Sequence, residues 1–425
     1  MLLEFGVKNY RSFRDEARLT MLPVNAYKEK PENLAPVKPL GTNSDGVLSA
    51  AVIYGANASG KTNLLKAIDF GRACAMGLIT FGSPDYRSAF VGCEAPSEFS
   101  FSIIANGTRY RYEFSLSDEG ATDEALYVRP RGERLVYRRT RQEDGSYAVK
   151  QGSMYSGIES KLKGFSDNGL VLNFLAKFGM PDCAAVVRWF VSTLSVHDKS
   201  DLLEQGEILQ KLINLGESSF TKVIDAVKSA DLGIVGAQIS VSDLTAEERE
   251  SQKVATDKIK AVFAALVGES SLELEPPDQK IVFQFQHTIN GNRVGFGFDR
   301  ESLGTVTLLN LAADFVDAIV NGRVLVVDEI ERSLHPMLLK SLVSLFFDRD
   351  LNTKNAQLVF TTHDLSIMSS DLLRRDQIWF VQKDPVTGGS ELYSLAEYSP
   401  RKDDNILNRY LYGAYGAVPF IERVL

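Results

Sequence analysis

Eight residues near the start of the chain, 55–62, read GANASGKT and fit the pattern G-x-x-x-x-G-K-[ST]. Glycines in this pattern let backbone N–H groups approach phosphate oxygens at the N-terminus of the helix that follows. Lys61 is expected to reach the β- and γ-phosphates of a nucleotide, and Thr62 to hold Mg²⁺ through its hydroxyl. The spacing therefore predicts binding of a nucleoside triphosphate together with Mg²⁺.

The segments on both sides of this loop have the composition that it needs. Residues 50–54 (AAVIY) form an apolar run typical of a buried strand, and residues 63–70 (NLLKAIDF) begin an amphipathic helix. A chance match in an ordinary turn would require neither, so the phosphate-binding interpretation is favoured.

Two strands predicted further along the chain are followed by residues that could bind Mg²⁺ and take part in hydrolysis of the nucleotide. Residues 323–327 (RVLVV) are typical of a central parallel strand and are followed by Asp328 and Glu329. Because carboxyl ends of parallel strands meet at one edge of a sheet, Asp328 is expected to join the Mg²⁺ shell and Glu329 to polarise the attacking water. His363 follows the strand predicted at 357–361 and is expected to sense the γ-phosphate. Asp328 and Glu329 could be an acidic strand end, and His363 could be a packed imidazole, but their order after a phosphate loop favours a functional role.

A further segment precedes an apolar-periodic helix predicted at residues 306–320. Ser302 can cap that helix, and Gly304 leaves backbone N–H groups uncovered. Alone this is an ordinary helix start, but its place shortly before the acidic pair makes it a candidate anion contact.

The order of these motifs resembles an ABC-type ATPase of the SMC, RecF and OLD branch. Residues 55–62 match Walker A, and residues 324–329 match Walker B with its catalytic glutamate. Residues 301–305 occupy the place of the ABC signature, residues 331–336 resemble the D-loop, and His363 matches the switch histidine.

The start and the end of the chain extend this resemblance. Residues 5–13 (FGVKNYRSF) resemble the first strand of that branch, where an Arg-Ser pair, here Arg11 and Ser12, lies near the nucleotide. The phrases YGANASGKTNLLKAI, DEIERSLHP and TTHD, with the tail at 408–419, resemble compact ATPases of bacterial anti-phage and abortive-infection systems, RloA/AbiLi-like and PARIS-type.

The resemblance implies an ATPase that uses ATP and Mg²⁺. It implies metal binding by Thr62 and Asp328, and catalysis by Glu329 and His363. The nucleotide-binding residues that it implies are Arg11, Ser12, Gly55, Asn57, Ala58, Ser59, Gly60, Lys61, Thr62, Asn63, Ser302 and Gly304.

Two departures from the family pattern are visible. Leu303 stands where the signature usually has a small or polar residue. No clear Q-loop glutamine follows the first strands, and Glu98 is the nearest substitute.

Composition restricts the functional class. The chain has 425 residues, 44% apolar and 24% charged, which is ordinary for a globular protein of two or three lobes. A net charge of −8 argues against a surface that binds nucleic acid throughout. Three scattered cysteines favour reduced thiols and a cytoplasmic location. We find no leader and no apolar run of about eighteen residues, so no membrane association is expected.

The predicted fold class is α/β, an ABC-type P-loop ATPase head with an antiparallel side sheet and a helical insertion. We expect a first ATPase lobe at 1–154, the helical insertion at 155–266, and a second lobe at 267–425. Residues 25–48 are expected to form an exposed loop. The insertion shows no sustained heptads, which argues against a coiled-coil SMC protein. We expect no Toprim domain after the second lobe.

By resemblance, the protein is an ATP-driven switch of an anti-phage system that assembles at least as a dimer with sites completed in trans. Such a switch controls a separate toxin or nuclease. The alternative is a RecF-like DNA-repair ATPase that binds DNA directly. A transporter ATPase would need a membrane partner and a Q-loop, and a non-enzymatic scaffold would have defective motifs, whereas Lys61, Asp328, Glu329 and His363 are all present.

Overall fold

The computed structural model describes residues 1–37, 46–79, 95–129, 132–163, 165, 168–197, 205–230, 233–267, 279–332, 334–368 and 372–418. Its contacts divide the chain into unit 1, Met1–Leu202 with Asp314–Leu425, and unit 2, Leu203–Ala313. These limits differ from the expected boundaries at 154/155 and 266/267. The first difference arises because the chain adds one more strand, Leu194–His197, to the sheet of unit 1 before unit 2 begins.

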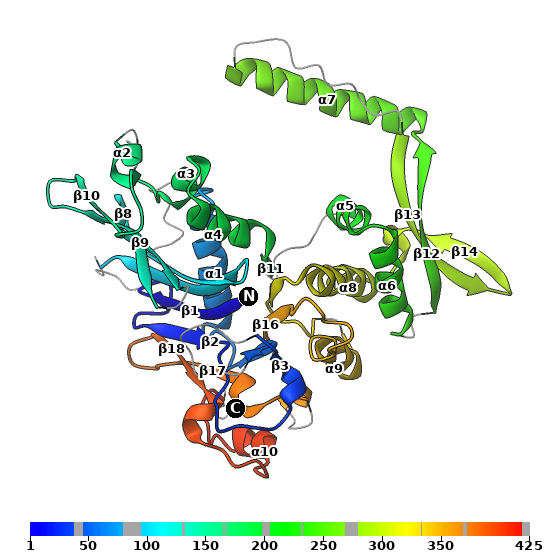
Figure 1. The fold of residues 1–425 in the computed structure, drawn as a ribbon. Helices are drawn as coiled ribbons and strands as arrows, with labels where there is room; N and C mark the ends of the chain where they lie inside the picture. The colour runs from blue at the N-terminus through cyan, green and yellow to red at the C-terminus, as the bar shows by residue number, and fades with distance from the viewer. Residues whose placement is uncertain are drawn as a thin grey trace. The chain divides into compact units, whose positions relative to one another are not determined.

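The central sheet of unit 1 has six strands in the order β11-β15-β16-β5-β17-β18 (Figure 1). Their bounds are β5 Ala50–Tyr54, β11 Leu194–His197, β15 Val324–Val327, β16 Gln357–Thr361, β17 Ile378–Lys383 and β18 Ser390–Ser394. All neighbours pair in parallel except β17 and β18. The strands β5, β15 and β16 are buried throughout, which confirms the three strands predicted from apolar runs.

An antiparallel sheet of seven strands forms the side of unit 1, in the order β10-β9-β8-β7-β6-β1-β2 (Figure 1). The strands are β1 Leu2–Lys8, β2 Ala17–Thr20, β6 Ser97–Ala105, β7 Thr108–Ser117, β8 Gly120–Arg129, β9 Arg134–Arg141 and β10 Tyr147–Gln151. Asn106 and Gly107, at φ values of 49° and 75°, make the two-residue turn between β6 and β7. The predicted antiparallel side sheet is thus confirmed.

The helix α1, Lys61–Ala75, lies against the side sheet. Gly71 permits this packing, because a Cβ there would stand 2.8 Å from the Phe101 ring of β6. Phe70 of α1 stacks on Tyr10 with ring centroids 5.5 Å apart. The remaining helices and short strands of unit 1 are α2 Ile158–Leu162, α3 Leu172–Lys177, α4 Pro181–Ser192, α9 Pro336–Ser344, α10 Ile406–Leu411, β3 Leu34–Ala35 and β4 Val47–Leu48, with 3₁₀ turns at Pro31–Asn33, Leu365–Met368, Arg375–Gln377 and Leu395–Tyr398.

The prediction that residues 25–48 form an exposed loop is correct only in part: residues 25, 26, 28, 31, 32 and 36 are exposed, and residues 38–45 lie outside the part of the chain that the structure describes. Asn33, Ala35, Val47 and Leu48 are buried. The segment cannot stand free in solvent because it supplies core side chains.

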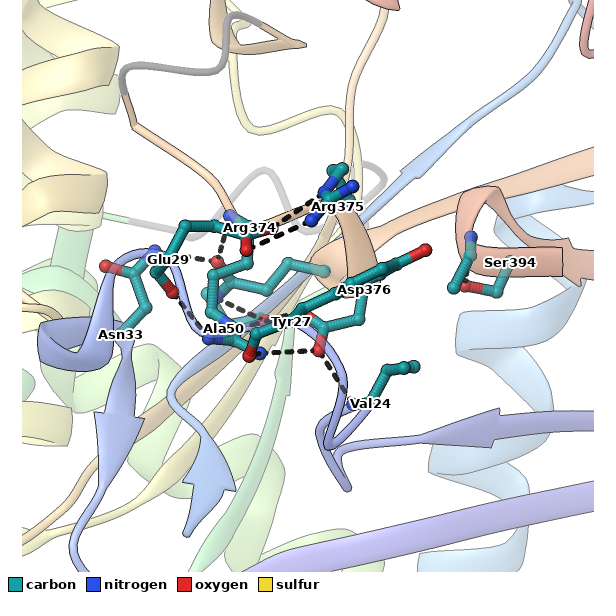
Figure 2. Close-up of polar contacts among 11 residues, drawn as sticks. Val24, Tyr27, Glu29, Asn33, Ala50, Arg374, Arg375, Asp376 and Ser394 are labelled. Atoms are coloured by element: carbon teal, nitrogen blue, oxygen red, sulfur yellow. Dashed lines mark hydrogen bonds and ion pairs between the residues drawn. The ribbon is translucent and has the colours of Figure 1, made fainter. Parts of the chain in front are cut away.

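Arg374, whose side chain is buried, holds this segment in place (Figure 2). Its guanidinium donates to the carbonyls of Tyr27 (3.0 Å) and Glu29 (2.6 Å) and pairs with Asp376 (2.8 Å). The Asp376 carboxylate in turn accepts from the Val24 amide at 2.8 Å. These contacts join residues more than 300 positions apart in the chain, so composition alone did not indicate them.

Unit 2 contains helices and a sheet of three antiparallel strands, β12-β13-β14. Its elements are α5 Gln205–Leu215, α6 Glu217–Lys228, β12 Ile234–Asp243, α7 Ala246–Val267, β13 Gln279–Ile289, β14 Asn292–Phe296, a 3₁₀ turn at Phe298–Arg300, and the first part of α8, Leu303–Asn321. The range 155–266, expected to be a helical insertion, therefore also contains the strands β11 and β12. The predicted capping box of α7 is present, because Thr245 and Glu248 exchange hydrogen bonds of 2.9 and 3.2 Å.

The helix α8 is long and apolar enough to cross a membrane by length and composition alone. Half of its most apolar window is buried within the protein, as in the core helix of a globular protein. It also carries Asp317, which pairs with Arg323 at 2.7 Å.

Candidate nucleotide-binding site

The phosphate-loop motif leaves the carboxyl end of β5 and leads into α1, as predicted. Two of its glycines are required by close packing. A Cβ at Gly55 would collide with the carbonyl of Val381, and one at Gly60, where φ is +117°, would collide with the Ser390 side chain. The loop is therefore held tightly against β17 and β18.

Lys61, the first residue of α1, is buried. Its ammonium donates to the carbonyls of Gly55 (2.8 Å) and Ala56 (3.1 Å). The side chain thus lies along the loop, where a phosphate oxygen can exchange for these carbonyl acceptors. Asn57 and Ala58 are exposed at the tip of the loop.

The structure brings Thr62 and Asp328 together from α1 and the end of β15. Thr62 Oγ1 donates to Asp328 Oδ2 at 2.8 Å, and Thr361 Oγ1 donates to Asp328 Oδ1 at 2.6 Å. A hydroxyl and a carboxylate are oxygen ligands of the kind that Mg²⁺ prefers. The predicted metal pair is therefore close enough to share one ion.

Thr361, at the end of β16, is a functional candidate that the sequence analysis missed. Besides contacting Asp328, its hydroxyl accepts from the Glu329 amide at 2.7 Å. Glu329 has a φ of 48°, a left-handed conformation that is unfavourable for a residue with a side chain. Thr361 therefore fixes both residues of the acidic pair, and only the pairing of β15 with β16 brings it there.

We expect Thr361→Val to slow ATP hydrolysis about tenfold, because it leaves the buried Asp328 oxygen and the Glu329 amide without their partner. Thr361→Ser, which keeps the hydroxyl, should retain most of the activity. Steady-state ATPase assays with a thermal-unfolding control measure both. Equal rates for the valine variant and the wild type would contradict the assignment.

His363 is exposed just beyond β16, at the same sheet edge. Its amide donates to Glu331 Oε1 at 2.6 Å. Although the residue is exposed, desolvation by the surrounding protein and then the Lys61 ammonium lower the pKa of His363, while Glu331, Glu329 and Asp328 oppose the shift. The imidazole is therefore neutral at pH 7, with one nitrogen able to donate and the other to accept a hydrogen bond.

Ser12 also reaches the phosphate loop. The turn Tyr10–Phe13 is closed by a pair of backbone hydrogen bonds of 2.9 Å, and Asn63 of α1 donates to Ser12 Oγ at 2.8 Å. Arg11, the other residue of the predicted Arg-Ser pair, donates from Nε to the Tyr10 hydroxyl at 3.2 Å.

Ser302 and Gly304 belong to unit 2, whereas the loop belongs to unit 1. Ser302 Oγ accepts from the Thr305 amide at 3.1 Å and so caps α8, as predicted. Ser302 is exposed, and so is Leu303, at 61% of its surface. The start of α8 is therefore accessible on unit 2.

One buried hydroxyl without a hydrogen-bond partner supports the binding of a phosphate by the loop. Ser59 is 3% exposed, and its Oγ makes no hydrogen bond. A buried hydroxyl without a partner is unfavourable unless a ligand supplies one. Together with the glycines and Lys61, this donor matches the needs of an anionic ligand.

Comparison with known proteins gives one family match. The family described as "AAA domain, putative AbiEii toxin, Type IV TA system" matches residues 50–176 and 184–369. No curated protein matches the chain.

Solved structures of SMC heads are also similar. The SMC head domain from Thermotoga maritima is 15% identical with a TM-score of 0.40, covering 92% of this chain and 98% of that one. An SmcHead bound to the C-winged helix domain of ScpA is 13% identical with a TM-score of 0.44, covering 94% and 99%.

Proposed function

Because the chain belongs to the family of AAA domains described as putative AbiEii toxins of type IV toxin–antitoxin systems, we propose that it is an ATP-hydrolysing switch of an anti-phage, abortive-infection system. The observation that carries this proposal is the 2.8 Å contact between Thr62 and Asp328 beside the buried Lys61. Lys61 and Thr62 of α1 thereby meet Asp328, from a segment more than 260 residues later, where the β- and γ-phosphates and Mg²⁺ of ATP would bind.

In this proposal each residue of the nucleotide site has its own role. Lys61 binds the phosphates, and Thr62 and Asp328 hold Mg²⁺, which when bound would neutralise charge on the transferred phosphoryl group. Glu329 orients and polarises the attacking water. Neutral His363 can hydrogen-bond the γ-phosphate and so sense its presence. Arg11, Ser12 and Asn63 border the nucleotide.

The switch is proposed to act as a dimer or larger oligomer in the cytoplasm. In each site the start of α8 from one subunit, with Ser302 and Gly304, would cap the nucleotide bound by the other subunit's loop. The exposure of Ser302 and Leu303 supports this role.

Mixing inactive Lys61→Ala chains with inactive Ser302→Arg chains should restore ATP hydrolysis. In a mixed dimer both defects fall in one site, so the second site is intact. The assay needs a measured subunit count and proof, by two different affinity tags, that mixed dimers form. A mixture that contains mixed dimers and stays inactive would remove the support for sites shared between subunits.

We propose that ATP hydrolysis by this protein controls a separate toxin or nuclease. The alternative is that the protein is a RecF-like ATPase of DNA repair. The family description, which names a toxin system, favours the first. A neighbouring toxin or nuclease gene, and toxicity in cells that needs both that gene and Lys61, would support it. DNA-stimulated ATP hydrolysis without any such gene would favour repair.

A further inference from the structure

Ser390, the first residue of β18, lies against the phosphate loop from the far end of the chain. Its side chain is 2.6 Å from the carbonyl of Ser59 and 2.9 Å from the hydroxyl of Ser12. Its amide donates to the Ser12 carbonyl at 2.7 Å. One residue thus contacts both the loop and the turn formed by Tyr10–Phe13.

The direction of these hydrogen bonds follows from what each group can do. The Ser59 carbonyl can only accept, so the single Ser390 proton points to it at the shorter distance. Ser390 Oγ is also the donor toward Ser12 Oγ at 2.9 Å, so its one proton is shared between two acceptors, and Ser12 Oγ accepts in addition from the Asn63 side-chain amide at 2.8 Å. These contacts form a hydrogen-bonded chain that joins Asn63, Ser12, Ser390 and the Ser59 carbonyl.

The chain ends on the carbonyl of the peptide between Ser59 and Gly60. The amide of the same peptide belongs to Gly60, one of the backbone donors that a phosphate loop offers to its ligand. Fixing the carbonyl therefore fixes the orientation of the amide.

The backbone of the loop at Gly60 approaches the side chains of Ser390 and Ser12 closely. A side chain on Gly60 would collide with Ser390 Oγ, and it would also stand 3.0 Å from Ser12 Oγ. Ser390 is only 7% exposed, so solvent cannot readily replace its contacts. The close approach of Ser390 thus requires that residue 60 has no side chain.

We propose that Ser390 is a positioning residue for nucleotide binding, which holds the Ser59–Gly60 peptide in the orientation that receives phosphate. The inference rests on the proposed function, because it assigns Ser390 to the same ATP site. Ser390 touches no nucleotide in this assignment; it acts through Ser59 and Ser12.

The test compares Ser390→Ala with Ser394→Ala on the same strand. Ser394 is equally buried, and its hydroxyl accepts from the Ala396 amide at 3.1 Å, so the control also loses one buried hydrogen bond. Hydrogen exchange of the loop amides at 55–62, without nucleotide, should accelerate in Ser390→Ala and not in Ser394→Ala.

With a fluorescent ATP analogue, Ser390→Ala should bind about five- to tenfold more weakly, with KM raised and kcat little changed. Ser394→Ala should bind as the wild type does. The double variant Ser12→Ala/Ser390→Ala should lose little more than either single variant, because both break one chain.

Unchanged loop exchange and unchanged affinity in Ser390→Ala, with wild-type protein that does bind ATP, would overturn the positioning role alone. An equal loss in Ser394→Ala would overturn it too, since a general loss of stability would then explain the effect. Wild-type protein that binds no ATP would overturn the proposed function, and with it this inference; faster loop exchange in Ser390→Ala would then show only that Ser390 supports the loop.

Discussion

Glu329→Gln should bind ATP as the wild type does and hydrolyse it at least about a hundredfold more slowly. Glutamine has nearly the same size as glutamate. Residue 329 donates to Thr361 Oγ1 at 2.7 Å through its backbone amide, so a change of its side chain does not remove this hydrogen bond. The substitution therefore removes the charge that polarises water and leaves the site's geometry in place. Phosphate release under saturating ATP, with binding measured separately, gives the two quantities.

Glu331→Gln is a matched control for that experiment. Glu331 lies two residues further along and accepts the His363 amide at 2.6 Å, which a glutamine carbonyl can also do. Its loss of turnover should be much smaller than that of Glu329→Gln. Wild-type turnover in Glu329→Gln, or equal losses in both variants, would refute the role of Glu329.

Lys61→Ala should weaken ATP binding by about a hundredfold or more, to the point where turnover is not detected. The Lys61 ammonium is the buried cation of the loop, at 2.8 and 3.1 Å from two loop carbonyls. Without it, the phosphates lose their closest positive charge in a poorly solvated place. Titration calorimetry with ATP and Mg²⁺ measures the change.

Lys66→Ala provides the matched control, because it removes the same charge from the same helix. Lys66 lies further along α1 and is half-buried, outside the phosphate loop. Binding by Lys66→Ala should stay close to that of the wild type. Nucleotide affinity that survives in Lys61→Ala would mean that the loop does not bind phosphate, and the proposed ATPase would have to be abandoned.

Local sequence by itself determined much of the nucleotide-binding framework. Short β-branched runs such as VLVV at 324–327 can be buried on both faces, so they predict central strands without any knowledge of their neighbours. Asn106 and Gly107 readily adopt the positive φ that a tight hairpin needs. Thr245 with Glu248 caps α7 within four residues. In the last two cases the stabilising contact is also close in sequence.

Contacts between distant residues decided what the sequence did not predict. The strand β12 was missed because it alternates only weakly and is stabilised by pairing with β13. The segment around Asn33 packs because Arg374 binds its backbone from the other end of the chain.

Contacts between distant residues also determine which side chains hold the nucleotide-site residues in place. Lys61, Thr62, Asp328, Glu329 and His363 stand in recognisable motifs, but Ser390 does not. Thr361 is the first residue of the phrase TTHD, yet that phrase pointed to His363 and indicated no role for Thr361. Ser390 is an ordinary hydroxyl residue in a β-strand, and nothing next to it in the sequence marks it. Strand order places Thr361 beside the acidic pair and Ser390 beside Ser59, 331 positions away in the chain. A hydrogen bond depends on distance and direction in space, and only the folded sheet sets these for residues so far apart.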